Sequence, residues 1–276
     1  MKNDVLIRFI SGMVGVSILI PAIVLSPLGM WLFVFIVSLM SLWEFIRGMQ
    51  VQQKRYVWVA LACVAGFWGL EFFNILMAGK QEIPPSLYAL VLILALPILE
   101  IVALFNKEEN RPVETLGTIV LGYIYVVFPF YLFLDMSMPG PPSTYDFKIP
   151  LGTLFITWTL DVMSYFFGRF FGKNQLFPRI SPKKTWEGSI GGVAFCLGMG
   201  VLMDIFLPTT YSWVVIAILT SLFSQMGDLV ESMFKRSVNL KDSGKILPGH
   251  GGMLDRFDGM LLSIPFIYLY FLTLGN

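Results

Sequence analysis

The chain has 276 residues, of which 56% are hydrophobic and 13% are charged, and its net charge is +1. Soluble domains carry about 25% charged residues, so this composition excludes an ordinary soluble globular protein and indicates a polytopic membrane protein. A net charge near zero provides no bulk field for nucleic acid or for peripheral attachment to a membrane, and no nucleic-acid partner is expected. Cys63 and Cys196 lie in apolar runs without metal-ligand spacing, so both are interpreted as small core residues.

Apolar stretches long enough to cross a bilayer, about 20 residues each, recur along the whole chain. The fold class expected is an all-α polytopic integral membrane protein of about nine transmembrane helices. In chain order the predicted helices cover residues 6–25, 29–46, 56–78, 86–105, 115–134, 150–171, 187–207, 211–234 and 258–274. The sixth and seventh give the weakest signal because they contain Asp161, Arg169, Glu187 and Asp204.

The distribution of positive charge predicts the orientation of these helices. Alternate loops hold 17 of the 19 Lys and Arg residues, and the opposite loops hold only Lys80 and Lys148. Lys and Arg concentrate in cytoplasmic loops, so the N-terminus is expected in the cytoplasm and the C-terminus outside. The PGPPS stretch at 139–143 is the clearest break in the chain. It predicts an N-terminal region, 1–138, of about five spans and a C-terminal catalytic region, 139–276, of about four.

Residues 232–258, SMFKRSVNLKDSGKILPGHGGMLDRFD, are the most polar stretch between two apolar runs. Cations suit phosphate oxygens and carboxylates suit a divalent metal, so the stretch indicates a polyanionic substrate carried with a metal. The glycines around His250 let the backbone approach a ligand closely. The His250 side chain itself is interpreted as a phosphate contact, a general base or a turn residue, since no second His or Cys lies near it for zinc.

Two sets of positions, in this region and just before it, are spaced for a common helical face. Gln225, Asp228, Ser232 and Lys235 follow at i, i+3, i+7 and i+10, with Glu231 beside them. Asp228 either lines a polar cavity as a metal ligand or pairs with a cation from another helix. Asp255 and Asp258 are three residues apart, and either join Asp228 in a metal site or cap the last helix.

Two further constellations precede this region. In RISPKKTWEG, 179–188, Ser181-Pro182 predicts a turn and Thr185 or Ser181 a helix cap. Lys183 and Lys184 then lie near a helix N-terminus, as an anion site or only as charges that hold the loop inside. Asp161 is followed by Ser164, Gly168 and Gly172, whose small side chains permit close helix packing. Asp161 either lines a cavity or bonds within the bundle, and Glu44, Glu71 and Glu100 are interpreted as interfacial or structural.

The 232–258 stretch resembles the signature of the phosphatidate cytidylyltransferases, the integral-membrane CDP-diacylglycerol synthases. The matching positions are Ser232, Lys235-Arg236, Lys241-Asp242, His250-Gly251-Gly252 and Asp255-Arg256-Phe257-Asp258. SPKKTWEG and the Asp161–Arg169 segment are also similar to that family's C-terminal half. The resemblance is diffuse before about residue 110, so residues there inherit no role.

The resemblance implies transfer of a cytidylyl group from CTP to phosphatidate, in a bacterial inner (plasma) membrane, with the active site facing the cytoplasm. It implies Mg²⁺, and leaves open a second, monovalent cation such as K⁺ and assembly into a homodimer. The expected catalytic residues are Asp228, Lys235, Arg236, Asp255 and Asp258, and the three aspartates among them are the expected metal ligands. The expected substrate-binding residues are Asp161, Ser181, Lys183, Lys184, Thr185, Ser232, Lys241, Asp242, His250, Gly251, Gly252 and Arg256.

Two other function classes fit parts of the sequence. A CDP-alcohol phosphotransferase also uses spaced aspartates, but Asp255-x-x-Asp258-Gly259 matches only the opening of that family's pattern. A transporter of a phosphorylated solute is expected to place charge near the membrane midplane and to show internal repeats. Here the charge clusters at one interface and no repeat is visible, so both remain alternatives.

Overall fold

A computed structural model describes residues 2–51, 53–77, 85–106, 110–138, 144–247, 249 and 251–274. Over these residues the chain is almost wholly helical, and a helical segment occupies each of the nine predicted ranges. The expected break at 139–143 lies outside the described residues. The chain forms two compact units, one of Met1–Phe147 with Asp242–Arg256, the other of Lys148–Lys241 with Phe257–Asn276.

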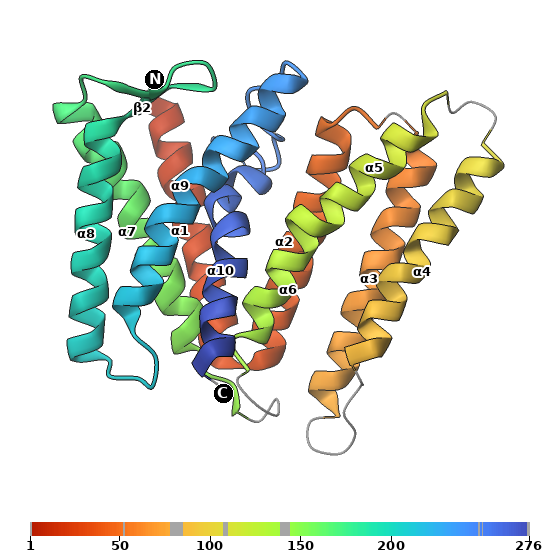
Figure 1. The fold of residues 1–276 in the computed structure, drawn as a ribbon, viewed down its shortest axis with the longest axis horizontal. Helices are drawn as coiled ribbons and strands as arrows, with labels where there is room; N and C mark the ends of the chain where they lie inside the picture. The colour runs from red at the N-terminus through yellow and green to blue at the C-terminus, as the bar shows by residue number, and fades with distance from the viewer. Residues whose placement is uncertain are drawn as a thin grey trace. The chain divides into compact units, whose positions relative to one another are not determined.

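The first unit is a bundle of helices that pack in chain order. Its elements are α1 (Lys2–Leu25), α2 (Pro27–Gly48), α3 (Lys54–Leu76), α4 (Pro85–Leu104), α5 (Pro112–Gly122), a π-helical turn (Tyr123–Val127), α6 (Phe128–Asp135) and a 3₁₀ turn, η3 (Leu254–Arg256). Helix α2 contacts α1, α3, α5 and α6, and also η3 (Figure 1). It is therefore the central element of this unit.

Buried indole hydrogen bonds hold α2 against α3. Trp68 Nε1 donates to Ser38 Oγ at 3.3 Å, and Trp31 Nε1 donates to the Trp68 carbonyl at 3.0 Å. Trp68 and Ser38 are both fully buried. Helix α2 begins at Pro27 because Ser26 caps it, with Ser26 Oγ accepting from Gly29 N at 3.0 Å.

The second unit contains the C-terminal helices and one short hairpin. Its elements are α7 (Lys148–Phe171), β1 (Gln175–Phe177), β2 (Ser181–Thr185), α8 (Trp186–Phe206), α9 (Trp213–Ser237) and α10 (Asp258–Leu274). Helix α7 packs on α8, α8 on α9 and α9 on α10, side by side in Figure 1.

Small residues bring α7 and α8 into backbone contact, as their four-residue spacing predicts. A Cβ atom at Gly188 would lie 2.7 Å from the Ser164 carbonyl oxygen and 3.0 Å from Gly168 Cα. A Cβ at Gly172 would lie 2.8 Å from the Thr185 side chain. No larger residue fits these positions without moving a backbone, so the prediction of close packing is confirmed.

The hairpin corrects the expected turn. Ser181 and Pro182 lie in strand β2, where Ser181 pairs with Phe177 in an antiparallel ladder, and the turn spans 178–180. Proline lacks an amide hydrogen, and an edge strand of a two-stranded ladder tolerates it. Ser181 and Pro182 are therefore the first two residues of strand β2, directly after the turn.

Asp204 is one of the charged residues that weaken the sequence signal of the seventh predicted helix, and the structure gives it a role. Its carboxylate accepts from Trp213 N at 2.7 Å, Val214 N at 3.3 Å and Ser212 Oγ at 2.9 Å. An acid near a helix N-terminus satisfies amide hydrogens that the helix leaves unpaired. Asp204 at the end of α8 is thus the cap of α9.

Within the described ranges, five helices are long and apolar enough to cross a membrane, namely Pro27–Gly48, Lys54–Leu76, Pro112–Asp135, Trp186–Phe206 and Trp213–Ser237. Shorter apolar helices cover Ile10–Leu25, Leu94–Leu104 and Asp258–Leu274. The chain is therefore an all-α membrane protein. The count of nine spans and the placement of the termini stay predictions.

Candidate active site

Helices α9 and α10 cross at Gly227 and Gly259. Gly227 precedes Asp228 and Gly259 follows Asp258, and both aspartates are predicted metal ligands. A Cβ atom at Gly227 would lie 2.8 Å from the Asp258 carbonyl oxygen and 3.1 Å from Gly259 Cα. The contact places the turn of α9 that carries Asp228 against the first residues of α10, Asp258 and Gly259. The glycines thus assemble two carboxylates from segments 30 residues apart in the chain.

Asp228 is paired with a cation in this structure. Lys184 Nζ lies 2.5 Å from Asp228 Oδ2, with side chains that are 27% and 38% exposed. Ser232 Oγ donates to Asp228 Oδ1 at 3.3 Å. Pairing was one of the two expectations for Asp228, and its partner comes from strand β2 instead of another helix. The metal role of Asp228 stays a prediction.

The predicted polar face of α9 is oriented toward the start of α8. Gln225 Oε1 accepts from Ser189 Oγ, and Gln225 Nε2 donates to the Ser189 carbonyl at 3.4 Å. One turn later Asp228 contacts Lys184. Gln225 and Asp228 therefore face the same 184–189 segment, as their spacing predicts.

Lys235, at the far end of this face, forms a buried ion pair. Lys235 Nζ lies 2.7 Å from Glu231 Oε2, and the two side chains are 12% and 1% exposed. Glu231 received no site role from the sequence, although its i, i+4 spacing to Lys235 predicts such a pair. The phosphate contact expected of Lys235 stays a prediction, and in this structure its ammonium group neutralises Glu231.

The SPKKT segment is held from both sides. Thr185 caps α8, with its Oγ1 accepting from Gly188 N at 3.2 Å, which confirms Thr185 and not Ser181 as the cap. Glu187, in the first turn of α8, accepts from Lys173 N at 3.1 Å and from Asn174 Nδ2 at 2.7 Å. Sequence reasoning missed Glu187 as the anchor of the hairpin that carries the two lysines.

The end of α9 fixes Arg236. Its Nη1 donates to the Leu240 carbonyl at 2.7 Å, while Leu240 N donates to the Lys235 carbonyl at 2.8 Å. Asn239 has φ of +59°, the left-handed conformation that ends many helices. Arg236 thus closes the helix end here, and Lys241 after it is exposed.

Asp255 closes the loop Asp242–Arg256, called the 242–256 loop below. Its carboxylate accepts from Ser243 N at 3.0 Å and from Gly252 N at 2.8 Å. Ser243 and Gly252 both lie in this loop and not in α10, so these bonds close the loop on itself. The two expected roles of Asp255, a cap of the last helix or a metal ligand, stay predictions.

Glycines in the 242–256 loop permit this approach. Gly251 has φ of +84°, and a Cβ there would lie 2.8 Å from Asp255 Oδ2. Gly249 also has positive φ, +75°. Gly251 thus lets the backbone approach the Asp255 carboxylate, and the expected close approach to a ligand stays a prediction. His250 lies outside the described residues.

Glu44 of α2 reaches the same loop. It is 1% exposed, and its Oε2 accepts from Leu254 N at 2.9 Å and from Ser243 Oγ at 3.3 Å. These contacts confirm the interpretation of Glu44 as a structural residue, and its partners belong to the predicted substrate loop. No sequence pattern signals a contact across 210 residues.

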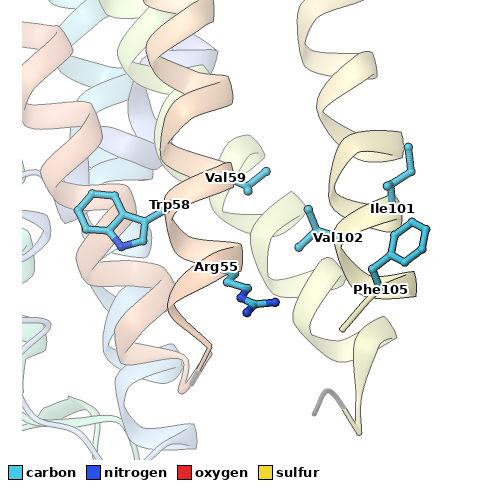
Figure 2. A pocket seen from close by; sticks show the side chains of 6 residues that line it. All are labelled: Arg55, Trp58, Val59, Ile101, Val102 and Phe105. Atoms are coloured by element: carbon cyan, nitrogen blue, oxygen red, sulfur yellow. The ribbon is translucent and has the colours of Figure 1, made fainter. Parts of the chain in front are cut away.

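A cavity of about 490 Å³ lies elsewhere in the first unit, between α3 and α4. Its lining is apolar except for one arginine, and consists of Arg55, Trp58, Val59, Ile101, Val102 and Phe105. Figure 2 shows Val59 and Val102 turned toward each other from the two helices. None of the predicted site residues lines this cavity.

The family model of the cytidylyltransferase family matches residues 6–274. The chain belongs to the cytidylyltransferase family. It is 32% identical over 274 residues to the phosphatidate cytidylyltransferase of Bacillus subtilis (strain 168), across 95% of each chain. It is 36% identical over 215 residues to that of Staphylococcus saprophyticus, across 71% of this chain and 82% of the relative. With that of Brucella abortus biovar 1 it shares 40% identity over 139 residues, 50% of this chain and 52% of the relative.

Membership makes the chain a nucleotidyltransferase enzyme. The family match includes the N-terminal helices, where the sequence alone showed only a diffuse resemblance. Glu44 therefore lies within the family's common region.

The carboxylates of a cytidylyltransferase offer the hard oxygen donors that Mg²⁺ prefers. Asp228 and Asp258 meet at the α9–α10 crossing, and their donor chemistry fits such an ion. In the residues that the structure describes, no three His, Cys, Asp or Glu side chains form a group that could hold a metal. Asp255 belongs to the other unit, so the three-carboxylate metal site stays a prediction.

Proposed function

We propose that this chain transfers a cytidylyl group from CTP to phosphatidate, giving CDP-diacylglycerol and pyrophosphate. One structural observation supports the proposal most strongly. The glycine crossing of α9 and α10 brings Asp228 and Asp258 together, and Lys184 lies against one of them. Carboxylates beside a cation suit a reaction between polyanions that carry a divalent metal. The relatives are phosphatidate cytidylyltransferases, and we take the two substrates from that activity.

The reaction needs no nucleophile from the protein. A phosphate oxygen of phosphatidate attacks the α-phosphorus of CTP, the new P–O bond forms, and the bond to the β-phosphate oxygen breaks. Pyrophosphate leaves with the electron pair. The work left to the protein is to bring two polyanions together in line and to neutralise the leaving group.

Asp228 and Asp258 are the residues that we propose to hold Mg²⁺, and Asp255 keeps its predicted role as a third ligand. Bound Mg²⁺ supplies charge neutralisation on the phosphate oxygens. The chain's own residues orient these carboxylates, since Ser232 donates to Asp228 and the Gly227–Gly259 contact fixes the helix spacing. A second, monovalent cation such as K⁺ remains part of the proposal.

The two substrates are bound by cations from two different segments of the chain. Lys183 and Lys184 of strand β2 approach the phosphatidate head group, and Lys241, Lys245 and His250 bind the CTP triphosphate. Lys241 and Lys245 are exposed in the structure, which supports a role on a ligand that arrives from solvent. Acyl chains of phosphatidate stay in the lipid of the bacterial inner membrane, with the reaction at its cytoplasmic face.

The test is turnover by the purified protein. We expect labelled CTP, phosphatidate and Mg²⁺ to give CDP-diacylglycerol and pyrophosphate in equal amounts, with no product when Mg²⁺ is chelated. Asp258→Asn, purified in parallel, is the control against a contaminating enzyme. Release of CMP from CDP-diacylglycerol on addition of an alcohol would instead identify a CDP-alcohol phosphotransferase. Solute flux into liposomes without nucleotide turnover would identify a transporter.

A further inference from the structure

Glu44 is a buried acid in an otherwise apolar helix. It lies in the C-terminal half of α2 between Trp43 and Phe45, and its side chain is 1% exposed. A buried carboxylate is costly unless hydrogen bonds or an ion pair compensate it. The hydrogen-bond partners of this carboxylate therefore decide what Glu44 does.

The hydrogen bonds that the Glu44 carboxylate accepts come from the 242–256 loop, about 200 residues later in the chain. Its Oε2 accepts from Leu254 N at 2.9 Å and from Ser243 Oγ at 3.3 Å. These two residues stand near opposite ends of the loop. One carboxylate oxygen therefore joins the beginning of the loop to its end.

Two glycines make room for this carboxylate. A Cβ atom at Gly244 would lie 2.7 Å from Glu44 Cδ, and one at Gly252 would lie 2.8 Å from the same atom. Any larger residue at either position would push the carboxyl group out of the loop. Glu44 and the loop are therefore complementary in shape as well as in hydrogen bonding.

Ser243 links Glu44 to Asp255. Its backbone N donates to Asp255 at 3.0 Å, and its Oγ donates to Glu44. Glu44 thus acts on Asp255 through a residue that both carboxylates contact. The second Glu44 oxygen, Oε1, is buried and has no hydrogen-bond partner among the described residues.

We propose that Glu44 is a positioning residue for catalysis. It holds the 242–256 loop in the conformation that presents Asp255 and the loop cations to the nucleotide phosphates. The inference rests on the proposed function, because that function gives the loop its substrate. It also assigns a part in the reaction to the N-terminal half of the chain, which the signature motif does not include.

The experiment compares Glu44→Ala and Glu44→Gln with a matched control, Ser38→Ala. Ser38 is also buried in α2, but it accepts a hydrogen bond from Trp68 of α3. Its replacement therefore removes a buried hydrogen bond of α2 without touching the loop. Glutamine keeps a carbonyl oxygen that can accept from Leu254 N and Ser243 Oγ, so it is the conservative variant.

Two readouts separate positioning from general stability. The first is trypsin cleavage after Lys245, an exposed residue inside the loop, in full-length protein in detergent without substrate. The second is the KM for CTP against the KM for phosphatidate. For Glu44→Ala we expect cleavage and the KM for CTP to rise about tenfold or more, the effect of losing hydrogen bonds to a charged group. We expect Glu44→Gln to recover most of both, and Ser38→Ala to resemble the wild type in both.

Wild-type rates of loop cleavage in Glu44→Ala would overturn the inference. So would equal effects of Glu44→Ala and Ser38→Ala on cleavage. If Glu44→Ala does not fold, Ser243→Ala takes its place, since it removes the Oγ bond to Glu44 and keeps the backbone bond to Asp255. The cleavage assay needs no turnover, so it decides the role of Glu44 in holding the loop even if the wild type makes no CDP-diacylglycerol. That last result would count against the proposed function, and with it against a catalytic purpose for the loop.

Discussion

Lys184 Nζ lies 2.5 Å from Asp228 Oδ2, so an ion pair joins strand β2 to the polar face of α9. Both side chains are about one third exposed, and such pairs contribute about 0–1 kcal/mol to stability. The pair can therefore open at low cost when an anionic ligand reaches Lys184. It places Lys184, a proposed substrate-binding cation, beside a proposed metal ligand, which is the arrangement that a phosphate bound to both would need.

This arrangement leads to a prediction about substrate preference. Lys184→Ala is expected to raise the KM for phosphatidate about tenfold, because a charge-assisted contact to phosphate is lost, and to raise the KM for CTP less. Lys241→Ala is expected to do the reverse. The measurement is initial rate against each substrate with the other saturating. Lys173→Ala is the control, since that side chain is exposed and its contact to Glu187 is through backbone.

Equal effects of Lys184→Ala and Lys241→Ala on both KM values would contradict the division of substrates. They would indicate one shared phosphate-binding region instead.

The metal prediction concerns Asp228 and Asp258. Replacement of either by Asn keeps the size of the side chain and removes its charge. We expect activity to fall at least about 100-fold at limiting Mg²⁺, because the loss of a ligand at a metal that stabilises the transition state costs several kcal/mol. The half-saturating Mg²⁺ concentration should rise in any variant with residual activity. Both quantities come from a Mg²⁺ titration of turnover.

Asp204→Asn is the matched control for these variants. Asp204 caps α9 at its other end, through bonds to Ser212, Trp213 and Val214. Its replacement removes a negative charge from a helix N-terminus, so it should lower the free energy of unfolding by about 0.3–1 kcal/mol and leave the Mg²⁺ dependence unchanged. If Asp258→Asn behaves like Asp204→Asn, then Asp258 is a helix cap and not a ligand.

The contact at Gly227 gives a prediction about the spacing of α9 and α10. In Gly227→Ala the new methyl group would lie 2.8 Å from the Asp258 carbonyl oxygen, so α9 and α10 must separate. Overpacking of this kind costs about 1–3 kcal/mol, and it moves Asp228 away from Asp258. We expect a large loss of activity together with a lower thermal unfolding temperature in detergent.

Gly198→Ala is the control for the crossing. Gly198 lies in α8, and nothing stands within 4 Å of a Cβ there. Alanine has a higher helix propensity than glycine. This variant should therefore be as stable as the wild type or slightly more stable, and it should be fully active. Normal activity in Gly227→Ala would show that the spacing of α9 and α10 does not matter to the reaction.

Most of the helices and several local contacts could be predicted from the sequence. Apolar runs of about 20 residues are local signals, and each predicted range contains a helix. The i+4 series of Ser164, Gly168 and Gly172 likewise predicts the contact of α7 with α8. The cap at Thr185 follows from its position just before the helix.

Contacts between distant segments could not be predicted. The Lys184–Asp228 pair depends on the register of a hairpin whose strands have only three and five residues, too short for a clear alternation. The bond from Glu44 to Leu254 joins residues 210 positions apart, and a glutamate near a helix end has many ordinary explanations. In each case the missing information is tertiary, because the residue types alone leave the partner undefined.

The last prediction concerns the membrane orientation of the second unit. Helix α8 has 21 residues, which at about 1.5 Å each is enough to cross the hydrocarbon core of about 30 Å. Residues just before and just after it should then lie on opposite sides of the membrane. We expect Lys183→Cys to be on the cytoplasmic side, with the N-terminus, and Thr210→Cys to be outside. Both positions are exposed in the structure.

The measurement is labelling of intact cells with a membrane-impermeant thiol reagent, after Cys63 and Cys196 have been replaced. Thr210→Cys should react and Lys183→Cys should react only after the cells are opened. Lys241→Cys should behave like Lys183→Cys, since α9 returns the chain across the membrane. Labelling of Lys183→Cys in intact cells would place the two lysines of strand β2 outside. The reaction could not then draw CTP from the cytoplasm at that face.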